Sequence, residues 1–173
     1  MTVVMIETSD QVIRKHLTDT WIEALVPQPT SPLEIPMSMK LTLAQSLGDV
    51  RVRDGVLHYI VDSYENSTYG NSTNHLHNNM YTVQTVRAVV DKFLASKSDY
   101  VSMAPLHTIE AICQWMLGLD HLAMRSIELA FEHEEHYNLA TLVEMGIETG
   151  LPVGEFTKTV LELTREDCME GTY

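Results

Sequence analysis

Three apolar helical segments with well-marked ends lie within residues 104–151, and they constrain the fold more than any other feature of the sequence. They run from about residue 105 to 117, from 121 to 133 and from 138 to 149. Apolar residues recur at helical spacing in each segment, and Gly118 and Gly150 stand where a helix commonly ends. Short connections between such segments predict helices packed as antiparallel hairpins.

Helical periodicity also extends to both sides of this region. Thr8 and Gln11 have the form of a capping box, with Ser9 as an alternative cap. The apolar face expected for the first helix comprises Val12, Ile13, Leu17, Trp21, Ala24 and Leu25. Further helices are expected over about 36–47, 49–61, 80–94 and 152–163. No alternating strand of convincing length is present, so the sequence predicts an all-α fold of seven or eight helices, repeat-like at its C-terminal end.

The chain has 173 residues, of which 45% are hydrophobic, and we expect residues 1–173 to form a single helical domain. Two stretches are expected to lie outside the packed core. Residues 63–79 are almost wholly polar, which predicts a mobile loop. Residues 165–173 predict a frayed acidic tail.

The net charge of −13 is concentrated in the C-terminal part, where residues 104–173 hold 13 acidic and only 3 basic side chains. Binding to a phosphate backbone needs clustered Lys and Arg, so direct nucleic-acid binding is not expected. The balance favours either a well-solvated surface or a protein partner that is itself basic. No apolar run approaches about 18 residues, and no basic-then-apolar leader precedes Thr8, so we expect a cytoplasmic protein that does not enter a membrane.

The segment 132–136, with the sequence Glu-His-Glu-Glu-His, is the strongest candidate for chemistry. Zinc proteases carry two histidines four residues apart on one helix with a glutamate between them. His133 and His136 are three apart, which on a helix leaves them about 60° apart around the axis, with Glu132 four residues before His136. The alternative, which we favour, is a polar helix end where histidines meet the negative end of the helix dipole. We therefore assign no metal ligand and expect no cofactor.

Other reactive residue types have simpler interpretations. His75 and His77 could complete a four-ligand site only if the polar loop reached the 132–136 segment. His58 and His107 stand beside apolar residues and are expected to be partly buried, while Cys113 is expected to be a core residue far from Cys168. Arg53 and Asp54 interrupt an apolar helix, which indicates a structural ion pair or a hydrogen bond to a loop rather than catalysis.

Two resemblances concern the helical region. The turn Gly118–Ala123, followed by Ile127 and Ala130, is similar to the second half of a tetratricopeptide repeat. A wider set of motifs resembles the C-terminal region of an actinobacterial protein family of unknown function, over about residues 38–62 and 80–156. The motifs are Leu47-x-x-Val50-Arg51-Val52-Arg53-Asp54, Ala104-Pro105-Leu106, Gly118-x-Asp120-x-x-Ala123, Leu139-Ala140 and Gly150-Leu151-Pro152. The resemblance implies helical architecture and a shortened copy carried by an actinobacterium or its phage, with 63–79 inserted.

From these observations we predict that the chain is a non-catalytic acidic protein that acts through protein–protein interaction. The identity of its partner is open, and so is the formation of a homodimer. The alternatives are a metal-dependent enzyme that uses the 132–136 segment, and an acidic decoy of a DNA-binding surface.

Overall fold

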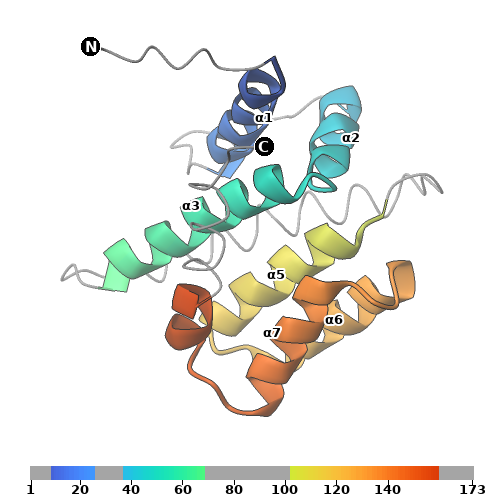
Figure 1. Cartoon of the computed structure of the whole chain (residues 1–173). Helices are drawn as coiled ribbons and strands as arrows, with labels where there is room; N and C mark the ends of the chain where they lie inside the picture. The colour runs from blue at the N-terminus through green and yellow to red at the C-terminus, as the bar shows by residue number, and fades with distance from the viewer. Residues whose placement is uncertain (1–8, 26–36, 69–101, 160–173) are drawn as a thin grey trace, which may run out of the picture.

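A computed structural model describes residues 9–25, 37–68 and 102–159 of the chain. Every regular element within these ranges is a helix, and Figure 1 shows how the helices are arranged. They are α1 (Ser9–Leu25), α2 (Met37–Ser46), α3 (Val50–Thr68), α5 (Ala104–Met116), α6 (Asp120–His133), α7 (Asn138–Glu148) and a further helical segment over residues 153–159. The expected all-α class is confirmed, whereas the helix expected over 80–94 and the tail 165–173 lie outside the described residues.

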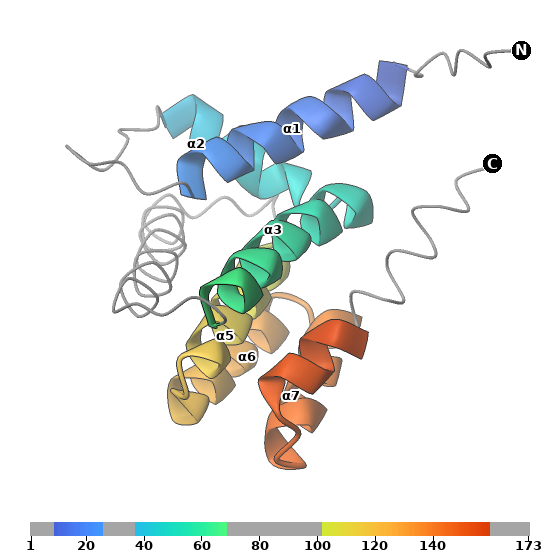
Figure 2. The ribbon, with the colours of Figure 1, turned by 90° about the vertical axis from the view of Figure 1, so that its left-hand side faces the viewer.

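The first helix packs against α2 and α3, and its buried residues lie toward its C-terminal end. Trp21 and Leu25 are buried there, as their spacing predicts. The prediction was wrong for Val12 and Ile13, which are 50% and 56% exposed. Both residues stand in the first turns of α1, and Figure 2 shows that this end of the helix projects beyond the rest of the fold.

Helix α3 begins where its cap was expected, because Asp49 accepts a hydrogen bond from the backbone N–H of Arg51 at 2.9 Å. It then continues to Thr68, six residues into the stretch 63–79 that was expected to be a loop. Once a helix has formed, each further residue adds a backbone hydrogen bond, and no Gly or Pro occurs between Ser63 and Gly70 to interrupt the helix. The remainder of that stretch lies outside the described residues, so its mobility stays a prediction.

Helix α5 is the central element of the fold. All 13 of its residues are buried, including the polar residues His107, Glu110 and Gln114. It packs against α3 on one side and against α6 and α7 on the other, and Figure 2 shows it between these helices. Polar side chains on a helix that is buried on all sides must find their hydrogen-bond partners inside the protein. The buried polar residues of α5 are therefore described with the site below.

The connection from α5 to α6 is a glycine-terminated turn of the Schellman type. Gly118 has φ of 72°, the left-handed region that side chains with a Cβ avoid. The Leu119 N–H donates to the Gln114 carbonyl at 2.9 Å, and the Gly118 N–H donates to the Trp115 carbonyl at 2.8 Å. The expected stop is confirmed, and it turns α6 back along α5.

Buried apolar residues from every described helix join one core, so the described residues form a single domain. The core includes Trp21, Leu43, Val52, Ile109, Ala123, Val143 and Phe156. None of the described helices is long and apolar enough to span a membrane. The repeat-like character of the C-terminal end stays a prediction.

Enlarging Ala123 is expected to destabilise the α5–α6 contact. Ala123 and Ala130 lie two turns apart on α6, and both are fully buried in the most extensive helix contact of the described fold. We expect Ala123→Leu to lower the free energy of unfolding by about 1–3 kcal/mol through overpacking, measured by urea denaturation. Glu128→Leu, an exposed position on the same helix, is the control and should change it by less than about 0.5 kcal/mol. Equal effects would show that α6 does not pack closely here.

Candidate functional site

A hollow of about 360 Å³ opens between segments that are far apart in the sequence. Its walls come from the α2–α3 turn, the beginnings of α3 and α5, and the α6–α7 turn. The apolar part of the lining is supplied by Ala44, Leu47, Val50 and Pro105, and the polar part by Gln45, Arg53, Ser102, Glu134 and Tyr137. The volume is in the range of sites that take a small molecule or one large side chain.

Arg53 is the cation in the wall of the hollow, and it is held from two sides. Its side chain is only 15% exposed, and its Nη2 lies 2.7 Å from Oδ1 of Asp54. Its Nε donates to the same oxygen at 2.8 Å, while Nη1 donates to the hydroxyl of Tyr137 at 3.1 Å. The geometry agrees with the structural interpretation of this pair, because Asp54 neutralises Arg53 inside the wall.

Tyr137 immediately precedes α7 and brings a phenol to the hollow. Burial raises the pKa of this phenol, against the lowering effect of the neighbouring Arg53. The hydroxyl therefore stays protonated at neutral pH, and its hydrogen can be donated while its oxygen accepts from Arg53. The Arg53 Cζ lies 6.0 Å from the centre of the Tyr137 ring, which fixes the ring against the guanidinium.

Glu134 supplies the exposed carboxylate of the hollow. It is the first residue after α6, with an extended backbone at φ −152° and ψ 97°. Ser102, just before α5, donates its hydroxyl to Oε2 of Glu134 at 3.3 Å. Because Asp54 cancels the charge of Arg53, Glu134 determines the net charge of the lining.

The 132–136 segment is divided by the end of α6 rather than carried on one helix. His133 is the last residue of α6, and His136 lies in the turn that follows. The expected separation of about 60° around a helix axis therefore does not apply. Within the described residues no group of three or more His, Cys, Asp or Glu side chains is arranged to hold a metal ion.

No protein-family model, curated protein or solved structure matches this chain. The resemblances to a tetratricopeptide hairpin and to an actinobacterial family therefore stay predictions. What the site can do must be inferred from its own geometry.

The other candidate residues are distributed through the fold rather than gathered at the hollow. Cys113 is buried on α5, and burial, with the nearby Glu110, raises the pKa of its thiol to about 12. It is thus a core residue, as predicted, and a poor nucleophile. His58 is partly buried on α3, whereas His75, His77 and Cys168 lie outside the described residues.

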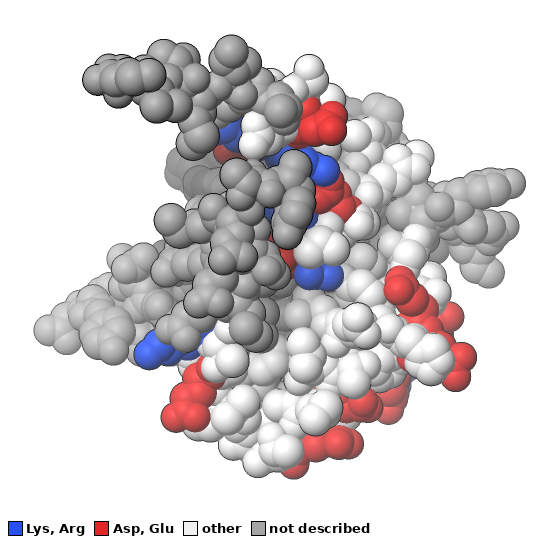
Figure 3. All heavy atoms as spheres, in the orientation of Figure 1, with Lys and Arg blue, Asp and Glu red and all other residues white. Residues whose placement is uncertain are grey.

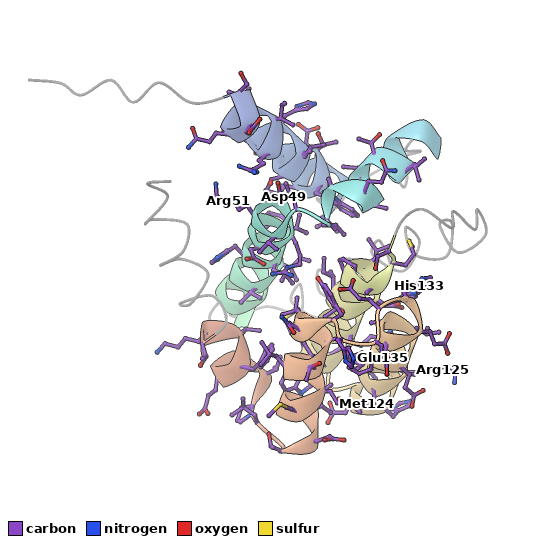
Figure 4. The ribbon with its side chains drawn as sticks, turned by 45° about the vertical axis from the view of Figure 1, so that its right-hand side comes forward. Asp49, Arg51, Met124, Arg125, His133 and Glu135 are labelled. Atoms are coloured by element: carbon purple, nitrogen blue, oxygen red, sulfur yellow. The ribbon has the colours of Figure 1, made fainter. Side chains whose placement is uncertain are left out.

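His107 differs from its expected partial burial, since it is completely enclosed. Its ring stacks on that of His133, with ring centres 5.5 Å apart and planes at 25°. Figure 4 shows His133 at the end of α6, beside the beginning of α5. The two histidines are brought together by the antiparallel course of α5 and α6.

Sequence reasoning missed Tyr137, Ser102 and Gln45 as lining residues of the hollow. None belongs to a catalytic or metal-ligand motif, and the hydrogen bond between Arg53 and Tyr137 joins residues 84 positions apart. The local signals near the hollow were the interruption of an apolar helix by Arg53 and Asp54 and the polar segment 132–136, which contains Glu134.

Proposed function

We propose that this protein is a non-catalytic interaction protein whose hollow receives a basic side chain from a protein partner. The observation that carries the proposal is the lining itself: an exposed carboxylate and a phenol next to apolar walls, with the Arg53 charge already neutralised by Asp54. This combination suits a side chain with an apolar stem and a cationic head.

The dimensions and chemistry of the hollow support a lysine or arginine. The methylene stem of such a side chain can lie along Leu47, Val50 and Pro105, and Val50 is 54% exposed. Its head can then pair with Glu134, and a guanidinium or ammonium group can also contact the Tyr137 ring.

The surrounding surface favours approach of a basic partner. Residues 102–159 contain nine acidic and two basic side chains. Figure 3 shows Asp and Glu side chains around the edge of the part of the molecule formed by α5, α6 and α7. Such a field accelerates encounter with a basic partner and weakens as salt is added.

Titration with blocked amino acids tests the proposal directly. N-acetyl-arginine methylamide and N-acetyl-lysine methylamide should shift the amide NMR signals of Gln45, Gly48, Ser102 and Tyr137, with weak affinity. The neutral isostere N-acetyl-citrulline methylamide should not, because it cannot form an ion pair with Glu134.

Paired charge variants provide the matched control. Glu134→Gln should weaken arginine binding about two- to fivefold, the effect of one exposed ion pair. Glu135→Gln makes the same change in net charge at the next residue, which does not line the hollow, and should leave binding within about twofold. Equal loss in both variants, or equal binding of citrulline, would refute docking at this hollow.

A further inference from the structure

His107 is a buried polar side chain whose ring nitrogens are not hydrogen-bonded to any residue in the described part of the chain. It is completely enclosed, and among the described residues neither its Nδ1 nor its Nε2 has a hydrogen-bond partner. Buried ring nitrogens almost always have a partner, since an unpaired polar group in the interior destabilises the folded state. The arrangement around His107 therefore calls for a functional explanation.

The carboxylate nearest to His107 is held in place by a chain of hydrogen bonds. Glu110 Oε2 lies 3.8 Å from Nδ1 of His107, too far for a hydrogen bond but close enough for charge interaction. Glu110 Oε1 accepts from the amide of Gln114 at 3.1 Å, and the Gln114 carbonyl oxygen accepts from Ser126 at 3.0 Å. The chain crosses from α5 to α6 and fixes one carboxylate oxygen toward His107.

The stack of His107 on His133 lies where the beginning of α5 meets the end of α6. This junction, called the seam below, separates two walls of the hollow. His107 is in the first turn of α5, close to the lining residue Pro105, and His133 directly precedes Glu134. The hydrogen bond from Ser102 to Glu134 crosses the same seam. Separation of the two rings would therefore change the shape of the hollow.

We infer that His107 and His133 form a proton-sensitive latch that holds the beginning of α5 against the end of α6 at neutral pH and opens when both rings are protonated. One proton on the pair is compensated by Glu110, whereas two put like charges on stacked rings. The open latch would widen the seam and add positive charge beside the hollow, and a bound basic side chain would then be released. This last consequence rests on the proposed function.

The ionisable groups around the latch support this direction. In the described part of the chain, Glu110 on α5 interacts with His107, and Glu132 on α6 interacts with His133. Burial and the neighbouring His107 hold the pKa of His133 below its usual value of 6.5, although Glu132 acts in the opposite direction. A histidine whose pKa is lowered by folding takes up its proton first in the unfolded chain. Its contribution to stability is therefore intact above pH 6.5 and is lost as the pH falls through that value toward the folded-state pKa.

An NMR pH titration of the full chain without any ligand tests the latch. Between pH of about 8 and about 5, the His133 ring signals should titrate with a midpoint below 6.5. The amide signals of residues 103–108 and 131–136 should shift with the same midpoint, while those of 140–147 should not. His133→Phe, which keeps a ring that cannot be protonated, should abolish the coupled amide shifts, and His133→Gln serves the same purpose if the ring change perturbs folding.

His121→Phe is the matched control, since it replaces a histidine by phenylalanine at an exposed position at the other end of α6. It should leave the coupled amide shifts unchanged. The latch is refuted if the amide shifts persist in both His133 variants, or if His133 titrates in the wild type without them. Because the sample contains no basic probe, this outcome does not depend on whether the hollow binds a basic side chain.

Discussion

Replacing Trp115 by alanine is expected to lower the free energy of unfolding by about 3–5 kcal/mol. The indole is only 6% exposed, and its ring centre lies 5.0 Å from that of Phe156 in a tilted arrangement. It fills the space between α5, α7 and the helical segment over 153–159. A truncation there removes buried apolar surface and leaves a cavity, which chemical denaturation followed by circular dichroism will measure.

Gly146 on α7 supplies a stringent test of this packing. A Cβ at Gly146 would lie 2.7 Å from Cη2 of Trp115 and 3.2 Å from Cδ2 of Phe156. Gly146→Ala should therefore destabilise the wild type, because the new methyl group overlaps the indole. In the Trp115→Ala background the overlap with the indole is removed. The remaining 3.2 Å contact with Phe156 can be relieved by a small shift of that ring into the space left by the indole, so the gain in helix propensity of up to about 1 kcal/mol should appear instead.

The sign of the Gly146→Ala effect is thus expected to reverse between the two backgrounds. This double-mutant cycle does not depend on the absolute size of either single effect. If Gly146→Ala has the same sign and size in both, the indole does not occupy the position against α7.

Trp21→Ala is expected to cost a similar amount, about 3–5 kcal/mol, at the opposite end of the fold. Trp21 is 2% exposed, and its Nε1 donates to the Leu43 carbonyl and to the Ser46 hydroxyl, both at 3.1 Å. It attaches α1 to the end of α2. Since both helices contribute to the same core as α5 and α6, we expect one cooperative unfolding transition at a lower denaturant concentration.

Trp21→Phe distinguishes the contribution of the buried aromatic ring to stability from that of the indole N–H. The phenyl ring keeps most of the buried surface, and the Leu43 carbonyl still accepts from Ser46 at 2.6 Å. The loss should therefore be closer to about 1 kcal/mol, the typical net value of one hydrogen bond. A Trp21→Ala protein that unfolds in two steps, with α5–α7 unaffected, would instead show that α1 and α2 form a separate unit.

The proposed docking site and latch use the same property of this fold. Helix α5 is surrounded by other helices, so its polar residues meet side chains from distant segments rather than water. At its beginning His107 lies against His133, and Ser102, which is exposed and precedes the helix, donates a hydrogen bond to Glu134. A basic side chain in the hollow and a proton on the latch would therefore act on one seam.

The sequence by itself determined the local features of the fold. Helical spacing of apolar residues predicted α1, α2, α5, α6 and α7 to within a few residues, and glycine predicted where α5 and α7 end. These features depend on hydrogen bonds and side-chain periodicity within a few turns, which a single segment contains. The buried state of Cys113 and the internal pairing of Arg53 with Asp54 were predicted for the same reason.

Only the tertiary structure decided which faces meet and which remain in water. The apolar pattern that buries Trp21 also includes Val12 and Ile13, yet no described helix covers those two residues enough to bury them. The hollow and the stack of His107 on His133 depend on the packing of helices whose contacting residues are distant in the sequence. Local periodicity indicates whether a helix face is apolar or polar. Which other helix packs on that face depends on how whole helices fit together, and no single segment specifies that fit.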